Sequence, residues 1–336
     1  MTAASDLAWS GATDAADWIG PRLDGFGTSV TSVIPSGFEA YARVLHPAGA
    51  RIGDDGAVRW REVAAWSGRT LQEDAQFHSV AFPSNDQDRP RPWHGQGPAQ
   101  GTLFRPDARQ LVEHLRRWTA TPDRCCFLVW DGYGWSSRTP MVAPGATTLV
   151  LPDPVPEWVR SGPKVKLPHR GYFLLMGPIE AVVTKDPFVA MEQTPNLWWP
   201  IDRTWCVASE IDLAWTYVGG SAEMIGQILA DDRMEVLAAE SNDPIGRTEP
   251  WLDRWIDEAV DKLWDSGHTT VITPLGTVEA ELDRPGRFRT GELRTRTART
   301  NGGGTGRALV GNGTQEEVKR TVMFQLQRAV IGLAEG

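Results

Sequence analysis

The segment from Trp198 to Trp205 holds the densest group of side chains that could recognise a ligand. It reads WWPIDRTW, so three indoles lie beside one aspartate and one arginine. Aromatic faces stack on sugars, bases or cations, and charged groups orient what is stacked. We therefore hypothesise a tryptophan-lined pocket here, next to a proline-rich loop; the alternative is that these indoles pack over the core. The predicted ligand-binding residues are Trp93, His94, Trp198, Trp199, Asp202, Arg203 and Trp205.

Two weaker groups of polar residues lie near predicted strand ends. Asp131-Gly132-Tyr133-Gly134-Trp135 follows an apolar run, and ordinary hairpin chemistry is its alternative explanation. Glu210 and Asp212 precede Gly219-Gly220-Ser221, where a helix is predicted to begin. The amino end of a helix attracts an anion, whereas two carboxylates attract a cation, so the second group leaves both possibilities open.

No catalytic motif identifies a reaction. The phosphate-binding GxxxxGK[ST], the nucleophile-bearing GxSxG and the zinc-binding HExxH do not occur, and the six histidines are scattered without ligand spacing. The cysteines Cys125, Cys126 and Cys206 make neither a disulfide framework nor a CxxC pair, so we expect them to be small buried hydrophobes. We therefore assign no catalytic residue, predict no metal and no cofactor, and leave open whether the protein is an enzyme.

The overall charge disfavours two classes of partner. A net charge of −9 repels nucleic acid and anionic lipid, so we expect neither, except that the Arg-rich segment 287–307 could contact phosphate. The amino terminus lacks the basic and apolar regions of a signal peptide, and the longest apolar runs are far too short to span a bilayer. We expect a cytoplasmic protein that does not bind a membrane and whose partner is another protein.

Apolar runs and helix caps predict many short elements. Their mixture favours an α+β fold, with a mixed or antiparallel central sheet, short helices and an appended C-terminal hairpin and helix. Strands are predicted at 28–34, 125–130, 147–151, 171–177, 179–184, 204–212 and 234–237. Helices are predicted from Ser36 through Tyr41 and Leu45, and at 58–66, 107–119, 221–230 and 249–266.

Tryptophan divides the chain into two parts. All sixteen lie between Trp9 and Trp264, and because such large side chains are rarely exposed, we predict a packed body over 1–267. Residues 268–336 are predicted to form a C-terminal extension. We interpret its Arg/Thr/Gly-rich linker, 286–313, as flexible or loosely ordered, because it lacks apolar periodicity. Its arginines could contact phosphate or an acidic protein surface; we favour the interpretation that they neutralise the acidic face of helix 249–266 within the same chain. The other parts of the extension are a hairpin of 269–273 and 276–282 and a terminal helix.

The centre of the chain resembles the SUKH (Smi1/Knr4-like) domains. The resemblance covers roughly a third of the chain and lies in the turn Trp130-Asp131-Gly132-Tyr133-Gly134, the strand pair predicted from Tyr172 to Val183 and the helix predicted from Ser221 to Ala230. It implies N-terminal helices with a mixed sheet, and an intracellular immunity or interaction role without catalysis. The chain is much longer than such domains, and the part after 268 has no counterpart in them. The whole chain is also similar to bacterial proteins of high-GC genomes, from which no function follows.

Two functional hypotheses result. The first is an intracellular protein-interaction module without catalysis, of an immunity-like kind, which predicts a broad acidic or aromatic surface. The alternative is an enzyme or small-molecule-binding protein with a tryptophan-lined pocket near 198–205, which predicts a concave site with convergent polar groups. Whether Trp198, Trp199 and Trp205 line a cavity or fill the interior distinguishes the two.

Overall fold

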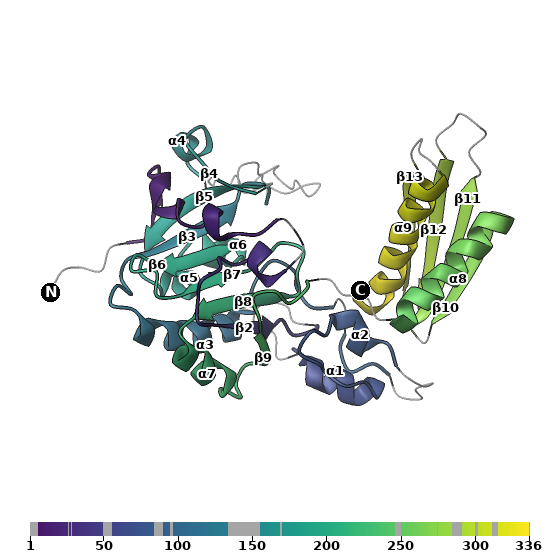
Figure 1. The fold of residues 1–336 in the computed structure, drawn as a ribbon, viewed down its shortest axis with the longest axis horizontal. Helices are drawn as coiled ribbons and strands as arrows, with labels where there is room; N and C mark the ends of the chain where they lie inside the picture. Colours follow the sequence, from purple (N-terminus) through teal and green to yellow (C-terminus); the bar gives the residue numbers. More distant parts are fainter. Residues whose placement is uncertain are drawn as a thin grey trace, which may run out of the picture. The chain divides into compact units, whose positions relative to one another are not determined.

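The chain divides into two compact units (Figure 1). Unit 1 comprises Met1–His46, Arg51–Asp55 and Ala99–Ile245, and unit 2 comprises Pro47–Ala50, Gly56–Pro98 and Gly246–Gly336. The boundary that the tryptophans suggested at 267–268 lies inside unit 2, between a helix and a strand that pack together. The computed structural model describes residues 6–25, 27, 29–49, 56–83, 90–94, 97–133, 155–168, 170–245, 250–273, 275–283, 291–299, 302–310 and 315–335.

Unit 1 is built on one antiparallel sheet of nine strands, which confirms the predicted α+β class. Eight strands follow the order β1-β5-β3-β6-β7-β8-β2-β9, and β4 pairs with β5. The apolar runs CCFLVW and GYFLLMG form β3 and β5 and are buried at successive positions, as expected for strands covered on both faces. The strands are β1 (Ala8–Ser10), β2 (Ala40–Leu45), β3 (Cys125–Trp130), β4 (Val165–Leu167), β5 (Arg170–Gly177), β6 (Leu197–Pro200), β7 (Cys206–Ala208), β8 (Trp215–Gly220) and β9 (Val236–Ala239).

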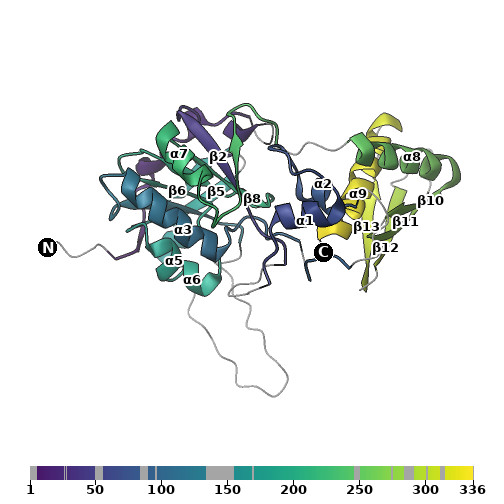
Figure 2. The ribbon, with the colours of Figure 1, turned by 90° about the horizontal axis from the view of Figure 1, so that it is seen from below.

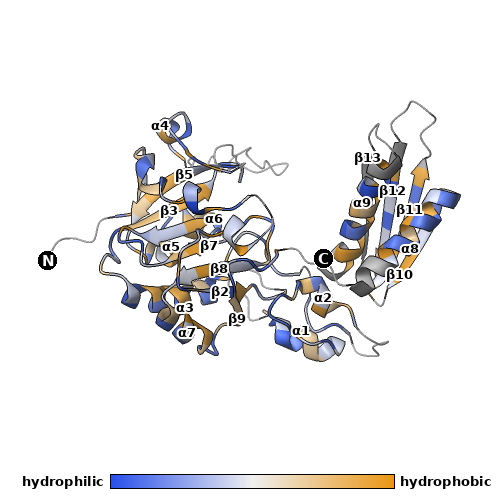
Figure 3. Ribbon diagram, viewed as in Figure 1, coloured by the Kyte–Doolittle hydropathy of each residue, from blue (hydrophilic) through white to orange (hydrophobic). Residues whose placement is uncertain are grey.

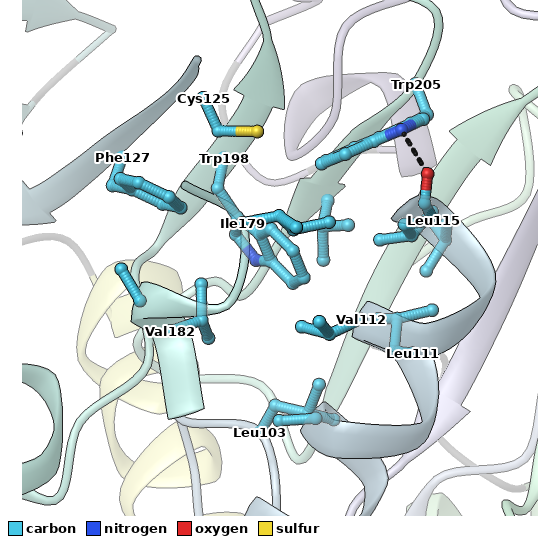
Figure 4. Packing of buried hydrophobic residues seen from close by; sticks show 14 of the residues in the cluster. Leu103, Leu111, Val112, Leu115, Cys125, Phe127, Ile179, Val182, Trp198 and Trp205 are labelled. Carbon is cyan, nitrogen blue, oxygen red and sulfur yellow. Dashed lines mark hydrogen bonds between the residues drawn. The ribbon is translucent and has the colours of Figure 1, made fainter. Parts of the chain in front are cut away.

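Helices cover one face of this sheet and share a hydrophobic core with it (Figures 2 and 4). Within the core, Trp198 and Trp205 meet edge to face, with ring centroids 5.5 Å apart. The Trp205 indole N–H donates a hydrogen bond of 3.1 Å to the carbonyl of Leu115, at the end of α3. This bond and the packing around it anchor α3 on the sheet. The helices of unit 1 are α3 (Arg105–Leu115), α4 (Glu157–Arg160), α5 (Ala181–Thr184), α6 (Phe188–Met191) and α7 (Ala222–Leu229), and a 3-10 turn, Arg116–Trp118, extends α3.

Short 3-10 turns replace regular elements near the amino end. The strand predicted at 28–34 is wrong, because Val30–Ser32 forms a 3-10 turn. The Ser32 hydroxyl donates to the Ser29 carbonyl at 2.6 Å, and such local side-chain bonds compete with a strand ladder. Two more turns, Thr13–Ala16 and Gly20–Arg22, precede it.

Tertiary burial reverses two other local predictions. The helix predicted from Ser36 through Leu45 is strand β2, which pairs with β8 on one side and β9 on the other. Its last five residues are all buried, whereas a surface helix buries one stripe only. The strand predicted at 179–184 is helix α5, whose Ala181 and Val182 enter the core beside α3. The strand predicted at 147–151 lies outside the described residues.

Unit 2 contains a compact aromatic cluster. Phe77 meets Trp60 and Trp93 edge to face, with centroids 5.4 and 5.5 Å away, and both indoles are fully buried. Gly68 ends the first helix with a φ of 70°, the left-handed conformation that glycine adopts at low cost, so the predicted stop is confirmed. The two helices of this part are α1 (Trp60–Ser67) and α2 (Phe77–Ala81).

The rest of unit 2 is a four-stranded antiparallel sheet with two helices on one face (Figures 1 and 2). The strands follow chain order, α8 packs on β10 and β11, and α9 packs on β11 to β13 and against α8. Leu263 of α8 and Leu326 of α9 are fully buried. The elements are α8 (Pro250–Ser266), β10 (His268–Thr273), β11 (Gly276–Asp283), β12 (Gly291–Arg299), β13 (Gly302–Val310) and α9 (Gln315–Glu335), so the predicted hairpin and terminal helix are confirmed.

The flexible linker predicted over 286–313 is wrong for the residues of β12 and β13. RTRT (294–297) alternates with period two, which is the period of a strand that has one large polar face and one small-residue face. Arg294 and Arg296 are exposed, whereas Thr295 and Thr297 are half-buried. The helices lie on the opposite face of the sheet, so these arginines do not lie along the acidic face of α8 as the sequence suggested.

We predict that Trp205→Phe lowers the free energy of unfolding of unit 1 by about 2–4 kcal/mol, because it opens a cavity and leaves the Leu115 carbonyl without its donor. Urea unfolding followed by far-UV circular dichroism measures the change. Trp158→Phe on α4 is the matched control: that indole is 55% exposed, and we expect a change below about 0.5 kcal/mol. Equal losses in the two variants would contradict the role assigned to Trp205.

Candidate functional site

The three tryptophans of the segment 198–205 lie on two faces of the sheet. Successive strand residues point to opposite faces, so Trp198 joins Trp205 in the helix-covered core (Figure 4) while Trp199 points away from it. There Trp199 meets Trp18 edge to face, with centroids 5.9 Å apart. All three are at most 1% exposed. They fill the interior, and the hypothesised pocket gains no support from them.

Asp202 and Arg203 shape the turn between β6 and β7. The Asp202 carboxylate accepts hydrogen bonds from the Thr119 hydroxyl at 2.7 Å and from the Ala120 N–H at 2.8 Å. Burial raises the pKa of Asp202, but these bonds outweigh it and hold the pKa below its ordinary value. Arg203 adopts a φ of 58°, and its guanidinium lies 5.5 Å from the Trp18 ring. Both side chains are engaged within the chain.

Trp93 and His94 belong to unit 2, whereas the other predicted residues belong to unit 1. Trp93 is fully buried and meets Trp66 edge to face at 5.5 Å, in addition to Phe77. His94 is exposed. The seven residues predicted to bind a ligand are therefore divided between two units and between interior and surface.

A hydrogen-bonded network gathers at one end of the unit 1 sheet, with Asn196 at its centre. The Asn196 amide nitrogen donates to the Tyr133 hydroxyl at 2.8 Å and to the Ser209 carbonyl at 3.0 Å. Its amide oxygen accepts from the Trp130 N–H at 2.8 Å. One side chain thus joins the end of β3, the start of β6 and the end of β7, and it uses most of its hydrogen-bonding capacity to do so.

The network continues to the end of β2. The hydroxyls of Ser209 and Thr216 are 2.6 Å apart, and Thr216 Oγ1 is 2.9 Å from His46 Nε2. His46 Nδ1 lies 2.6 Å from the carbonyl oxygen of Ala99. Burial lowers the pKa of His46 to about 4 and raises that of Tyr133 to about 12, so both groups are neutral at pH 7. Such a hydrogen-bonded buried network ties strand ends together.

An ion pair lies at the same end of the sheet. Arg170 donates to Glu210 at 2.6 Å and reaches Asp212 at 3.3 Å, and its guanidinium lies 5.3 Å from the Trp130 ring. Burial raises the pKa of Glu210, and Arg170 opposes that shift. The structure therefore brings together two groups that the sequence kept apart, the Tyr133 turn and the Glu210/Asp212 pair. Because Arg170 already pairs with both carboxylates, the arrangement does not favour a cation.

The predicted helix start lies at the other end of β8. Six residues separate the two ends, which is about 20 Å in a strand. The Ser221 hydroxyl accepts from the Met224 N–H at 3.2 Å, which confirms the predicted cap, and the Glu39 carboxylate accepts from the Ala222 N–H at 3.0 Å. A carboxylate of the chain itself thus occupies the position predicted for an anion.

The cysteines are all buried, as predicted. Burial raises the pKa of all three thiols, that of Cys126 to about 12, so they are protonated at neutral pH and poor nucleophiles. Within the described residues, no three His, Cys, Asp or Glu side chains come together as a metal ion requires. None of the described helices has both the length and the apolar character needed to cross a membrane.

The face of the unit 2 sheet opposite α8 and α9 is exposed and sorted by charge. Glu279 and Glu281 of β11 are exposed on it, as are Arg294 and Arg296 of β12. The register pairs Glu281 with Arg294 and Glu279 with Arg296. An acidic row thus lies beside a basic row. We call this surface the charged face; its exposed residues are His268, Thr270, Ile272, Glu279, Glu281, Arg294, Arg296, Ala298 and Thr305.

The edge strands supply uncharged positions to the charged face. Ile272 on β10 is 75% exposed. It shares one row of the register with Thr277, Ala298 and, on β13, Gly303. A large apolar side chain at one edge therefore has glycine in the same row at the other edge. The charged face has a hollow near its arginines and glutamates. The hollow is lined by His268, Glu279, Glu281, Arg294, Thr295, Arg296, Thr305 and Gly306.

The charged face was not predicted from the sequence, because residues 286–313 were expected to form a flexible linker. A flexible linker has no fixed pairing with β11, so its arginines could not be placed beside the glutamates of that strand. The available signal was the period-two alternation of EAE (279–281) and of RTR (294–296), which assigns each charge to one face of a strand.

We predict that His46 makes the stability of unit 1 depend on pH. The unfolded imidazole has an ordinary pKa near 6.5 and the folded one a pKa of about 4, so protons bind first to the unfolded state and stability falls as the pH drops through this window. The expected loss between pH 7.5 and pH 5 is about 2 kcal/mol, and His46→Gln removes it. Urea unfolding at both pH values measures the difference.

The titration of the His46 ring in the unaltered protein checks the same prediction directly. Its carbon resonance should stay in the neutral position down to pH 5; a midpoint near pH 6.5 would show that the imidazole is not held neutral by burial.

Comparison of the chain with protein-family models, with curated proteins and with solved structures finds no match in any of the three. Its function has to be inferred from its own residues and their geometry.

Proposed function

We propose that this protein is a protein-interaction module that binds its partner through the charged face. The observation that supports this most is the sorting of charge by strand, with glutamates on β11 and arginines on β12. Solubility is served by any mixture of exposed charges, whereas positive and negative patches in fixed positions favour association with a partner of complementary charge. The exposed Ile272 adds an apolar contact at the edge.

A protein suits the charged face better than nucleic acid does. A phosphate backbone that contacted Arg294 and Arg296 would also lie beside Glu279 and Glu281, which repel it. Among the described residues of the four strands, Ile272 is the large apolar side chain that is exposed, and it offers no ring on which a base could stack. Binding through the Arg-rich segment 287–307 to phosphate is therefore disfavoured.

The geometry of unit 1 also agrees better with binding than with catalysis. Its thiols are kept protonated and the His46 imidazole is engaged in a buried network, so neither is ready to act as a nucleophile or a base. The alternative of a tryptophan-lined pocket requires open space beside the indoles of 198–205, which are buried. We include in the proposal the immunity-like role that the SUKH resemblance implies.

Site-specific photo-crosslinking tests the proposal. A photoreactive phenylalanine analogue in place of Ile272 should give, on irradiation of cells that make the protein, an adduct with a defined protein. The adduct should disappear in the variant Arg294→Glu/Arg296→Glu, because the reversed charges repel the same partner. Gel mobility and mass spectrometry identify the adduct.

The control places the same analogue at Phe324 on α9, which is 54% exposed and lies on an element that covers the other face. No adduct is expected there that depends on Arg294 and Arg296. The absence of any adduct at 272, or identical adducts at both positions, would refute binding through the charged face.

A further inference from the structure

We infer that the partner of the charged face is a second copy of this chain, which makes the protein a symmetric dimer; the inference rests on the proposed function. A surface that binds its own copy must be complementary to itself under a two-fold rotation. The charged face meets this condition at its centre, because Glu279 and Glu281 of β11 lie in register with Arg296 and Arg294 of the adjacent strand β12.

The register defines the rotation. Let the two-fold axis run parallel to the strands, midway between β11 and β12, with the two sheets face to face. The rotation then places β11 of each copy over β12 of the other and leaves every position along the strands unchanged. Glu281 meets Arg294 of the other copy, and Glu279 meets Arg296. Four pairs of opposite charge result, and each charge lies near two of the opposite sign.

The uncharged positions on the edge strands β10 and β13 agree with the same axis. The rotation places β10 of one copy over β13 of the other. Ile272 and Gly303 lie in the same row of one sheet, so Ile272 of one copy meets the position of Gly303 in the other copy. A protruding side chain that is 75% exposed thus faces a residue without a side chain. Thr270 meets Thr305 in the next row, so no like charges oppose each other in these two rows.

One outer row limits the contact. Asp283 and Glu292 are register partners, and the rotation places their positions opposite each other near the end of the strands. We therefore expect attraction from the three rows that contain Glu281, Glu279 and Ile272, and separation of the sheets beyond them.

The size of the face indicates a weak, transient contact. Four strands spaced about 4.8 Å apart and about 20–25 Å long offer on the order of 500 Å² per copy, or about 1,000 Å² in total. This lies at the lower limit of specific interfaces, so we expect a dissociation constant on the order of 10 µM. The dimer should exchange rapidly and form at protein concentrations of about 100 µM.

Charge reversal with complementation tests the inference on the full chain. One variant carries Glu279→Arg and Glu281→Arg, so both of its rows are basic; another carries Arg294→Glu and Arg296→Glu, so both are acidic. We expect each alone to dimerise much more weakly, with a dissociation constant at least about 10-fold higher than that of the wild type. An equimolar mixture should dimerise again, as should a single chain with all four substitutions. Sedimentation velocity measures all five samples.

Each result has a definite meaning. A wild-type chain that stays monomeric at about 100 µM, or reversed variants that dimerise like the wild type, would overturn the inference. Circular dichroism shows whether each variant folds, and the four-substitution chain retains opposite charges within each sheet in any case. If the wild type is monomeric but crosslinks to another protein at position 272, dimerisation fails and the proposed function stands; if neither occurs, both fail.

Discussion

The alternation of side chains along antiparallel strands determines which residues of this chain can meet. Neighbours in sequence such as Trp198 and Trp199 are sent to opposite faces, one into the core under α3 and the other toward Trp18. The same rule places Arg294 and Arg296 of β12 on one face and Thr295 and Thr297 on the other. A group of residues that is dense in sequence is therefore often dispersed in space, and a group that alternates is gathered on one surface.

Antiparallel pairing also determines which strand ends meet, because the end of one strand lies beside the start of its neighbour. The end of β3, the start of β6 and the end of β7 meet where Asn196 joins Tyr133 to Ser209. Buried polar groups that satisfy one another cost little, whereas the loss of one partner leaves the others unpaired. We therefore regard the network and the adjacent Arg170–Glu210 pair as the device that holds this end of the sheet in register.

Local signals in the sequence predicted the elements that local interactions determine. The cap at Ser221, the stop at Gly68 and the buried run Cys125–Trp130 all have their causes within a few residues. Strand β2 did not, because burial on both sides by β8 and β9 outweighs a capping signal at Ser36. The candidate site was hidden for a related reason: the charged face exists only once β11 and β12 are paired, and a search for apolar periodicity passes over a strand whose exposed positions are arginine and whose covered positions are threonine.

The charges of the charged face have a second, intramolecular use, which has to be separated from recognition. Opposite charges in register across two strands stabilise a sheet by about 0.2–1 kcal/mol for each pair, so Glu281 beside Arg294 already favours the fold of an isolated chain. This effect depends only on each glutamate having an arginine as its neighbour. Alternating the signs along each strand would give the same number of cross-strand pairs, and the two-fold rotation would still bring opposite charges together in each row. What the arrangement by strand adds is a tolerance to sliding of one sheet along the other. The chain instead places Glu279 and Glu281 together on β11 and Arg294 and Arg296 together on β12, so that these neighbouring rows attract in the same sense and tolerate a small shift along the strands. An interface that lies at the lower size limit gains most from this arrangement, because its charges remain complementary even when the two sheets are not perfectly aligned.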